Sequence, residues 1–161
     1  VAVNQHGQKS KVDNNGITVS GVGNLLTHMA KCCQPVAGDE ILGFITQGRG
    51  ISVHRKDCEQ LANSLQQQPE REVEVQWGEQ RRGVYKVTVS IIAYDRQGLI
   101  RDVSTIIANE RLLILGLESH TDNNKHTTNM LINIEIADND SLTRLLNKFL
   151  QLDDVIEAIR K

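Results

Sequence analysis

YKVTVSIIAYDRQGLI, residues 85–100, is the stretch that decides the fold of the second half of this chain. Up to Ala93 its apolar side chains alternate with polar ones, which is the period of a half-buried strand. From Leu99 onward the apolar residues fall at helical spacing instead. The stretch therefore predicts a strand that enters a helix through a tight turn at Gly98.

The sequence after this stretch repeats the same two periods. Apolar runs at residues 112–117 and 128–136 predict two strands, and the Asp-Asn-Asn turn at 122–124 joins them. An apolar stripe through residues 142–150 predicts a second helix, and residues 155–159 predict a last short strand. This order is the ferredoxin-like βαββαβ unit, a four-stranded antiparallel sheet with two helices on one face.

The bare face of such a sheet is commonly used for a partner, a nucleic acid or a second copy of the chain. RNA-recognition sheets stack bases on aromatic residues, and residues 127–134 contain none. Small-molecule-sensing sheets instead use a glycine before the first helix, whose N-terminus would bind an effector carboxylate. The candidate effector-binding residues are Asp95, Gly98, Leu99 and Ile100. A tight turn alone would also explain Gly98.

The first half of the chain holds all three cysteines, close to one histidine. Three thiolates and one imidazole are a usual ligand set for a structural zinc ion. The metal ligands that we predict are Cys32, Cys33, His54 and Cys58, with His28 in reserve. Adjacent cysteines can share one ion only if the backbone turns there, which a nearby proline and glycine favour.

Two other states of these cysteines stay open at this point. Metal-free thiols buried in the core are one, because cysteine is among the most buried residue types. A disulfide is the weaker alternative, since a bridge between Cys32 and Cys33 is strained and any bridge leaves an odd thiol. No secretory signal peptide precedes the module, so we expect a cytoplasmic protein with zinc as its structural cofactor.

A hairpin and a helix are expected to position these ligands. Alternation within residues 41–53 predicts two strands around a glycine-rich turn, which delivers His54 to a strand end. Asp57 is the expected N-cap of the next helix. Cys58 would then lie in the first helical turn, where unpaired N–H groups favour a thiolate. Residues 73–77 alternate as one more strand.

Composition and turn signals divide the chain into parts. Its 161 residues are 39% hydrophobic and 24% charged, values typical of a soluble globular protein without a membrane span. Residues 1–20 are polar and are expected to form a linker or disordered tail. The fold class that we predict is α+β, with a small cysteine-rich module at 21–80, a charged hinge at 78–83 and the ferredoxin-like unit at 84–161.

Nucleic-acid binding would have to depend on a local patch, because the net charge is -2 and only 3% of the residues are aromatic. Arginine and lysine side chains there would contact phosphates and fix position without reading sequence. The candidate RNA-binding residues are Lys31, Arg49, Arg55, Lys56, Arg81 and Arg82. A single such side chain is more often merely solvated, so the prediction concerns the cluster.

Catalytic motifs are not evident in the sequence. Gly21 and Gly23 do not begin a dinucleotide fingerprint, because Leu26 stands where a third glycine is required. Zinc deaminases need His-x-Glu, whereas His54 is followed by Arg55 and Lys56. We therefore expect a binding module and not an enzyme.

Both halves resemble one protein family. The segments that carry the resemblance are SGVGNLL (20–26), MAKCCQP (29–35), GDEI (38–41), GFITQGRGI (43–51) and HRKDC (54–58). They resemble the C-terminal regulatory part of the long RelA/SpoT proteins of the bacterial stringent response, and TQGRG (46–50) looks more like the RelA branch than the SpoT branch. The Asp-Arg-x-Gly-Leu turn at residues 95–99 resembles that of the ACT domain.

The resemblance implies a regulatory fragment of a (p)ppGpp synthetase, a GTP pyrophosphokinase, without its enzymatic part. It implies a zinc-finger-like module and an ACT domain that hold the protein on a ribosome carrying uncharged tRNA and relay this state to its own synthetase domain. The alternative is an amino-acid-sensing, dimerising ACT module without direct RNA contact. A homodimer through the ACT domain is expected in either case, and no membrane partner is.

Overall fold

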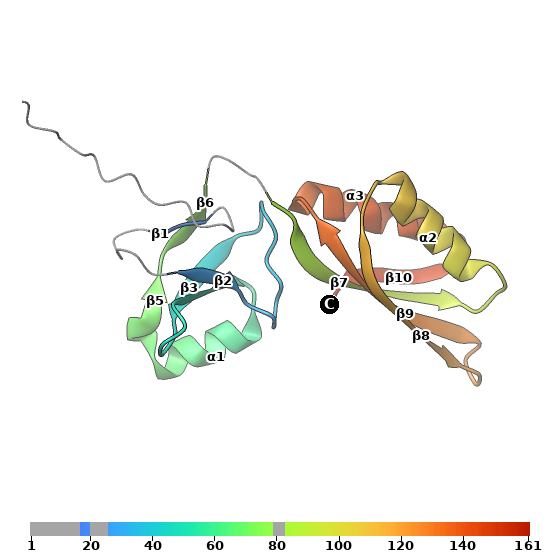
Figure 1. The fold of residues 1–161 in the computed structure, drawn as a ribbon. Coiled ribbons are helices and arrows are strands. Elements are labelled where there is room, and N and C mark those ends of the chain that lie inside the picture. Colours follow the sequence, from blue (N-terminus) through green and yellow to red (C-terminus); the bar gives the residue numbers. More distant parts are fainter. Residues whose placement is uncertain (1–16, 20–25, 79–82) are drawn as a thin grey trace, which may run out of the picture. The chain divides into compact units, whose positions relative to one another are not determined.

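The computed structural model describes residues 17–19, 26–78 and 83–161 (Figure 1). These residues fall into two compact units, which are described separately below. The first unit extends up to Cys32 and resumes at Glu40–Gly83, and the second consists of Cys33–Asp39 and Val84–Lys161. Most of the expected tail and the basic residues Arg81 and Arg82 lie outside the described residues.

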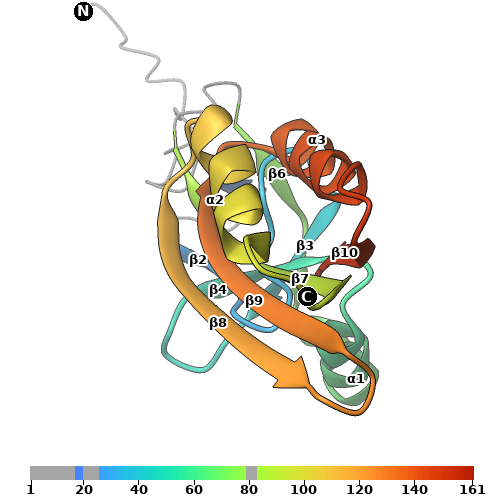
Figure 2. The same ribbon diagram turned by 90° about the vertical axis from the view of Figure 1, so that its right-hand side faces the viewer.

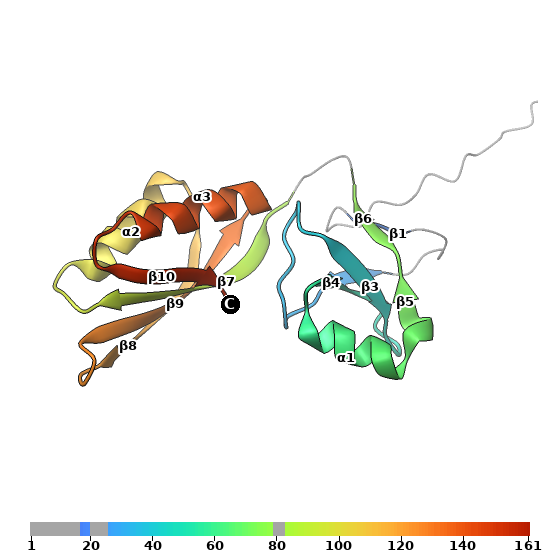
Figure 3. The ribbon, with the colours of Figure 1, turned by 180° about the vertical axis from the view of Figure 1, so that it is seen from behind.

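The first unit contains one larger and one smaller sheet. Its elements are β1 (Ile17–Val19), β2 (Thr27–Met29), β3 (Ile41–Ile45), β4 (Ile51–Arg55), α1 (Glu59–Gln67), a 3-10 turn (Pro69–Arg71), β5 (Glu72–Val73) and β6 (Val75–Trp77). The larger sheet has the order β2-β4-β3-β5, in which only β2 and β4 are parallel, and β1 pairs with β6. Helix α1 lies along one side of the larger sheet (Figure 3).

The core of the first unit is a small group of aliphatic side chains. Its buried members are Ile17, Ile41, Ile51, Val53, Val73 and Val75. Ile17 is 0% exposed, so the prediction of a tail over residues 1–20 is wrong for Ile17–Val19. This short strand is surrounded by polar sequence, and the partner that completes it, β6, lies far away along the chain. Periodicity cannot detect a strand of this kind.

Gly50 closes the β3–β4 hairpin in a left-handed backbone conformation, with φ of 73°. A Cβ at this position would lie 2.1 Å from the main-chain oxygen of Leu26. The same oxygen accepts a hydrogen bond from the N–H of Ile51 at 2.8 Å, next to the β2–β4 pairing. Only glycine therefore allows β2 to approach β4 here.

Replacing Gly50 with alanine is expected to destabilise the first unit by about 1–2 kcal/mol from the left-handed backbone alone. Displacement of the Leu26 oxygen adds to this loss. Gly48→Ala is a matched control, because Gly48 is also left-handed, with φ of 83°, and a Cβ added there would have no atom within 4 Å. Chemical denaturation measures both variants, and equal losses would contradict the steric role of Gly50.

The second unit has the predicted ferredoxin-like topology. Its elements are β7 (Tyr85–Tyr94), α2 (Leu99–Asn109), β8 (Ile114–Asp122), β9 (Thr127–Ile136), α3 (Asn139–Leu150) and β10 (Val155–Arg160). The strands form an antiparallel sheet in the order β10-β7-β9-β8. Both helices cover the same face of this sheet (Figure 2). None of the helices in the described part of the chain is long and apolar enough to cross a membrane.

Alternation along the two central strands creates the core of the second unit. The buried side chains of β7 and β9 alternate with more exposed ones along each strand, and they face the apolar stripes of α2 and α3. The completely buried members include Val89, Ile91, Val103, Ile107, Ile132, Ile134, Leu145 and Phe149. The period-two and helical patterns of the sequence therefore identified the correct faces.

Strand β8 differs from its prediction in both bounds. The apolar run at 112–117 suggested an earlier start, but Arg111 has φ of 59° and the N–H of Leu112 still bonds to the Ile107 oxygen. The chain is therefore turning out of α2 at this point. At the other end, β8 continues through polar residues to Asp122, because its pairing with β9 does not require apolar side chains.

The segment Cys33–Asp39 belongs to the second unit although the sequence places it among the cysteines. The side-chain oxygen of Gln34 accepts a hydrogen bond from the N–H of Thr88 at 2.8 Å, and its main-chain oxygen accepts one from Arg160 at 3.0 Å. Val36 and Ala37 are completely buried. The second unit is therefore built from two separate stretches of the chain.

Asp39 is the main polar anchor of this segment. Its carboxylate accepts two hydrogen bonds from Arg160, each 2.9 Å long, and one from the N–H of Val36 at 2.8 Å. The side-chain amide of Asn139, at the start of α3, donates a further bond. Burial raises the pKa of Asp39, but these hydrogen bonds outweigh burial and hold the pKa below its ordinary value. Asp39 is therefore a buried, fully paired carboxylate.

Candidate metal centre

The structure brings the four predicted ligands together. One ligand atom from each of Cys32, Cys33, His54 and Cys58 lies within 4.8 Å of every other. Cys33 and Cys58 are buried, whereas Cys32 is exposed. The backbone turns at residues 31–33, and Gln34 follows with φ of 48°, so the adjacent cysteines can both face the cluster.

The separations of Cys32 Sγ from two of the other ligand atoms fit a tetrahedral ion. Zn–S bonds of about 2.3 Å and a Zn–N bond of about 2.0 Å would place two sulfurs roughly 3.8 Å apart and a sulfur and nitrogen roughly 3.5 Å apart. The Sγ atoms of Cys32 and Cys58 are 3.6 Å apart, and Cys32 Sγ lies 3.4 Å from His54 Nδ1. Four such ligands close the coordination shell, which suits a structural ion rather than a catalytic one.

His54 presents its two ring nitrogens to different neighbours. Nδ1 faces Cys32, and Nε2 lies 2.9 Å from the hydroxyl of Ser52 on the same strand. Burial lowers the pKa of His54, and the nearby charge of His28 lowers it further. The neutral imidazole, which is the form that binds metals, is thus favoured. The contact with Ser52 was not among our predictions.

Cys58 is the N-cap of α1, which corrects the prediction that Asp57 would be. The helix begins at Glu59, and the N–H of Cys58 bonds to the oxygen of Arg55 at 3.0 Å. The carboxylate of Asp57 is instead directed to Arg55, with Oδ1 3.2 Å from Nε. The Cys58 sulfur remains beside the N-terminus of α1, where a thiolate is favoured.

The structure does not bring all of the predicted RNA-binding residues to one place. Arg55 and Lys56 lie at the end of β4, whereas Arg49 lies in the turn that precedes the same strand. Arg55 is half-buried beside Asp57, and Lys31 is exposed next to the cysteines. Arg49 is therefore separated from Arg55 and Lys56 by the length of β4, and RNA binding by this set of residues stays a prediction.

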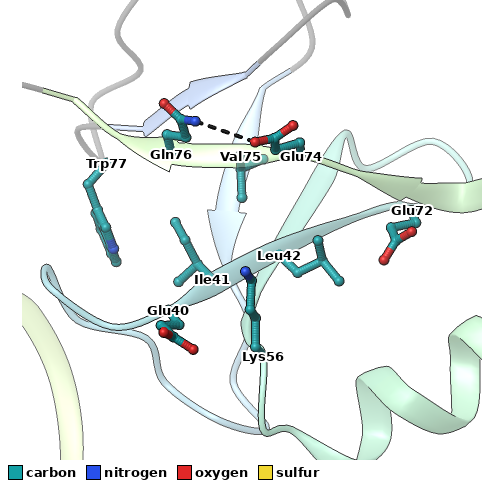
Figure 4. A pocket seen from close by; sticks show the side chains of 9 residues that line it. All are labelled: Glu40, Ile41, Leu42, Lys56, Glu72, Glu74, Val75, Gln76 and Trp77. Carbon is teal, nitrogen blue, oxygen red and sulfur yellow. Dashed lines mark hydrogen bonds between the residues drawn. The ribbon is translucent and has the colours of Figure 1, made fainter.

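A groove with a volume of about 650 Å³ gives Lys56 an acidic environment (Figure 4). The groove is lined by Glu40, Ile41, Leu42, Lys56, Glu72, Glu74, Val75, Gln76 and Trp77. Figure 4 shows the Lys56 side chain between Glu40 and Glu72. Three carboxylates and one ammonium group line this groove, so this part of the surface does not favour phosphate.

The predicted effector residues occupy the turn between β7 and α2. Gly98 is the N-cap of α2 with φ of 84°, which explains the need for glycine. Asp95 accepts a hydrogen bond from the Thr128 hydroxyl at 3.2 Å. Leu99 is buried in the core, while Ile100 is exposed. The turn thus has clear structural roles for Asp95, Gly98 and Leu99, and effector binding stays a prediction.

Arg96 holds this turn against its neighbours. Its guanidinium pairs with Asp102 in the first turn of α2, at 2.6 Å, and with Asp154 before β10. The hydrogen bond from Arg96 lowers the pKa of Asp102, so that carboxylate stays ionised. Sequence spacing could not have indicated the pair with Asp154, because the two residues are far apart along the chain.

Comparisons with known proteins agree with both units. Residues 17–78 match the model of the RelA/SpoT RIS domain, and residues 81–160 match that of an ACT domain. The chain is 50% identical over 153 residues to a GTP pyrophosphokinase of Escherichia coli (strain K12), covering 95% of this chain and 21% of that relative. It is 46% identical over 159 residues to a GTP pyrophosphokinase of Haemophilus influenzae, covering 99% of this chain and 21% of that relative.

A relative from a distant bacterial group shows the same pattern. The bifunctional (p)ppGpp synthase/hydrolase RelA of Mycobacterium tuberculosis is 39% identical over 148 residues, covering 92% of this chain and 20% of that relative. The chain thus spans about a fifth of the length of these curated relatives. Both family matches lie within it, and together they account for nearly all of its described residues. The chain therefore belongs to the RelA/SpoT family and carries the RIS domain and the ACT domain of that family.

Proposed function

We propose that this chain is the non-catalytic regulatory part of a stringent-response GTP pyrophosphokinase. It docks the enzyme on a ribosome with uncharged tRNA and controls (p)ppGpp synthesis by the synthetase domain of the same protein. The observation that carries the proposal is the 50% identity across 95% of this chain to a GTP pyrophosphokinase of which it spans only 21%. The RIS and ACT matches support a regulatory role.

In this proposal the cysteine cluster keeps the RIS domain rigid enough to act as a docking surface. Cys32, Cys33, His54 and Cys58 would hold a zinc ion, which supplies a cross-link and no reaction chemistry. The ligands come from the turn at 31–33, the end of β4 and the start of α1. These parts of the chain would otherwise depend on a small aliphatic core.

Exposed basic side chains would make the contact with RNA. Lys31 and Arg49 are exposed, and neither side chain lines the acidic groove that contains Lys56. Contacts of this kind bind phosphates through charge, release counterions and so weaken as salt rises. The ACT domain contributes few basic groups on its sheet, where Thr88 and Asn133 bond to each other. We therefore assign the RNA contact to the RIS domain.

A salt titration tests the docking proposal. The affinity of the chain for ribosomes with deacylated tRNA, measured by co-sedimentation, is expected to fall linearly with salt on logarithmic axes. Arg49→Gln should weaken binding and reduce the slope by about 1. Lys86→Gln, an exposed change on β7 of the ACT domain, serves as the control and should leave the slope unchanged. Absence of binding, or binding that salt does not affect, would refute the proposal.

A further inference from the structure

Ser52 lies behind the candidate metal centre, in a position where a hydroxyl group is unusual. It is only 7% exposed and sits in the central part of β4, which is flanked by β2 on one side and β3 on the other. Ser52 and His54 are two residues apart on this strand, so their side chains point to the same side of the sheet. The Ser52 Oγ atom is 2.9 Å from His54 Nε2.

The second neighbour of Ser52 offers an acceptor for the hydroxyl proton. The hydroxyl donates its single proton toward the main-chain oxygen of Phe44, which faces Ser52 across the β3–β4 ladder at 3.5 Å. A carbonyl oxygen can only accept, so the lone pairs of the hydroxyl are left for His54. With the hydroxyl in this orientation, the ring carries its proton on Nε2 and donates it to Ser52.

A neutral imidazole with its proton on Nε2 has its free lone pair on Nδ1. This nitrogen faces the thiols and lies 3.4 Å from Cys32 Sγ. The opposite tautomer would direct an N–H group into the cluster, and the Ser52 hydroxyl would then have to turn its proton from Phe44 to Nε2. The hydroxyl therefore favours the one tautomer in which His54 can act as the fourth ligand.

We propose that Ser52 is a positioning residue for the metal centre, which holds His54 as an Nδ1 ligand by accepting the proton of Nε2. The inference rests on the proposed metal site and specifies which nitrogen binds. Partners of this kind typically contribute about 10–100-fold to metal affinity, because without them a ligand populates other tautomers and ring orientations.

Metal titration of the whole chain tests this role with three variants. Zinc affinity is measured by competition with a chromophoric chelator, and cobalt(II) absorption reports the ligand set. Ser52→Ala is expected to weaken zinc binding about 10–100-fold, while Ser52→Thr, which keeps the hydroxyl, should restore it. Thr46→Val is the matched control, because it removes a hydroxyl bonded to the Gly50 oxygen at 2.7 Å in the same hairpin, away from the cluster.

Nitrogen-15 NMR of the His54 ring provides a readout that a merely structural role would not change. In the zinc-loaded chain the His54 ring is expected to carry a proton on Nε2 that is protected from exchange with water. Ser52→Ala should lose the NMR signal of this proton. Without metal, Ser52→Ala and Thr46→Val should have the same stability. Wild-type affinity and an unchanged ring signal in Ser52→Ala would overturn the assignment of Ser52 alone. Failure of the unaltered chain to bind zinc would overturn the metal site itself, and the role of Ser52 with it.

Discussion

Replacing Arg160 with alanine is expected to lower the free energy of unfolding of the second unit by about 3–5 kcal/mol. The Arg160 guanidinium makes two 2.9 Å hydrogen bonds to Asp39, and the Asp39 side chain is only 5% exposed. Loss of the guanidinium leaves a buried negative charge without the two hydrogen bonds that Arg160 donates. The cost of such an uncompensated charge exceeds the net contribution of the intact pair.

Arg144 supplies the matched control for this experiment. Its Nε lies 3.0 Å from Glu110 Oε2, but its own side chain is 59% exposed. Lys148 also pairs with Glu110, so that carboxylate keeps a cation and Arg144→Ala should have a much smaller effect. Chemical denaturation followed by circular dichroism measures both variants, and hydrogen exchange in β10 assigns the change to the second unit. Similar losses for Arg144→Ala and Arg160→Ala would argue against a special role for the buried pair.

Acid should affect the same site in a defined direction. Although burial raises the pKa of Asp39, its hydrogen bonds lower it further, so the folded-state pKa lies below the ordinary value of 3.8. Asp39 therefore contributes stability above that value, and the contribution disappears as the pH falls through the folded-state pKa. Without Arg160 the burial effect dominates and raises the pKa of Asp39 above its ordinary value. Protonation then removes a buried charge, so the second unit of Arg160→Ala should gain stability as the pH falls, opposite to the unaltered chain.

Removal of the metal is expected to have the largest effect on the first unit. Structural zinc contributes about 10–16 kcal/mol in zinc-finger peptides at neutral pH. The first unit also has an aliphatic core, so a smaller loss is expected here. Cys58→Ser should reproduce most of the loss, because it removes one of four ligands. The second unit contributes only Cys33 to the cluster and has its own core around Phe149, so it should lose less stability than the first.

The chain contains one tryptophan, which makes this prediction easy to measure. Trp77 is in β6 and packs against the core of the first unit, so its fluorescence reports the unfolding of that unit. The transition is compared before and after removal of the ion with a strong chelator. His28→Ala is the control, because His28 is not one of the four clustered groups. Coincident transitions with and without the ion would support the open alternative of inert, metal-free thiols.

The sequence predicted the second unit well because strong local patterns determine its elements. Ten residues of alternation in β7 and the stripe of α3 each indicate an element without reference to any other part of the chain. The ligand types also indicated the metal cluster, since cysteine and histidine are few here and lie close together along the chain. The family resemblance was confirmed by the RIS and ACT matches.

Features that depend on distant contacts could not be predicted in this way. Asp39 and Arg160 are separated by 121 positions, and no local pattern links them. Ile17–Val19 is a strand only because β6 pairs with it. Lys56 lines a groove together with Glu40, Glu72 and Glu74, which lie well before and after it along the chain. Dimerisation through the ACT domain and effector binding stay predictions.

The interrupted course of the second unit limits how these domains can be exchanged between proteins. Gln34–Asp39 lies inside the stretch that matches the RIS domain, yet its contacts are with β7, α3 and β10. A gene fragment that begins at residue 84 would encode an ACT domain without this piece. Recombination at that boundary would separate Arg160 from Asp39, so an ACT domain transferred in this way would lose its buried ion pair.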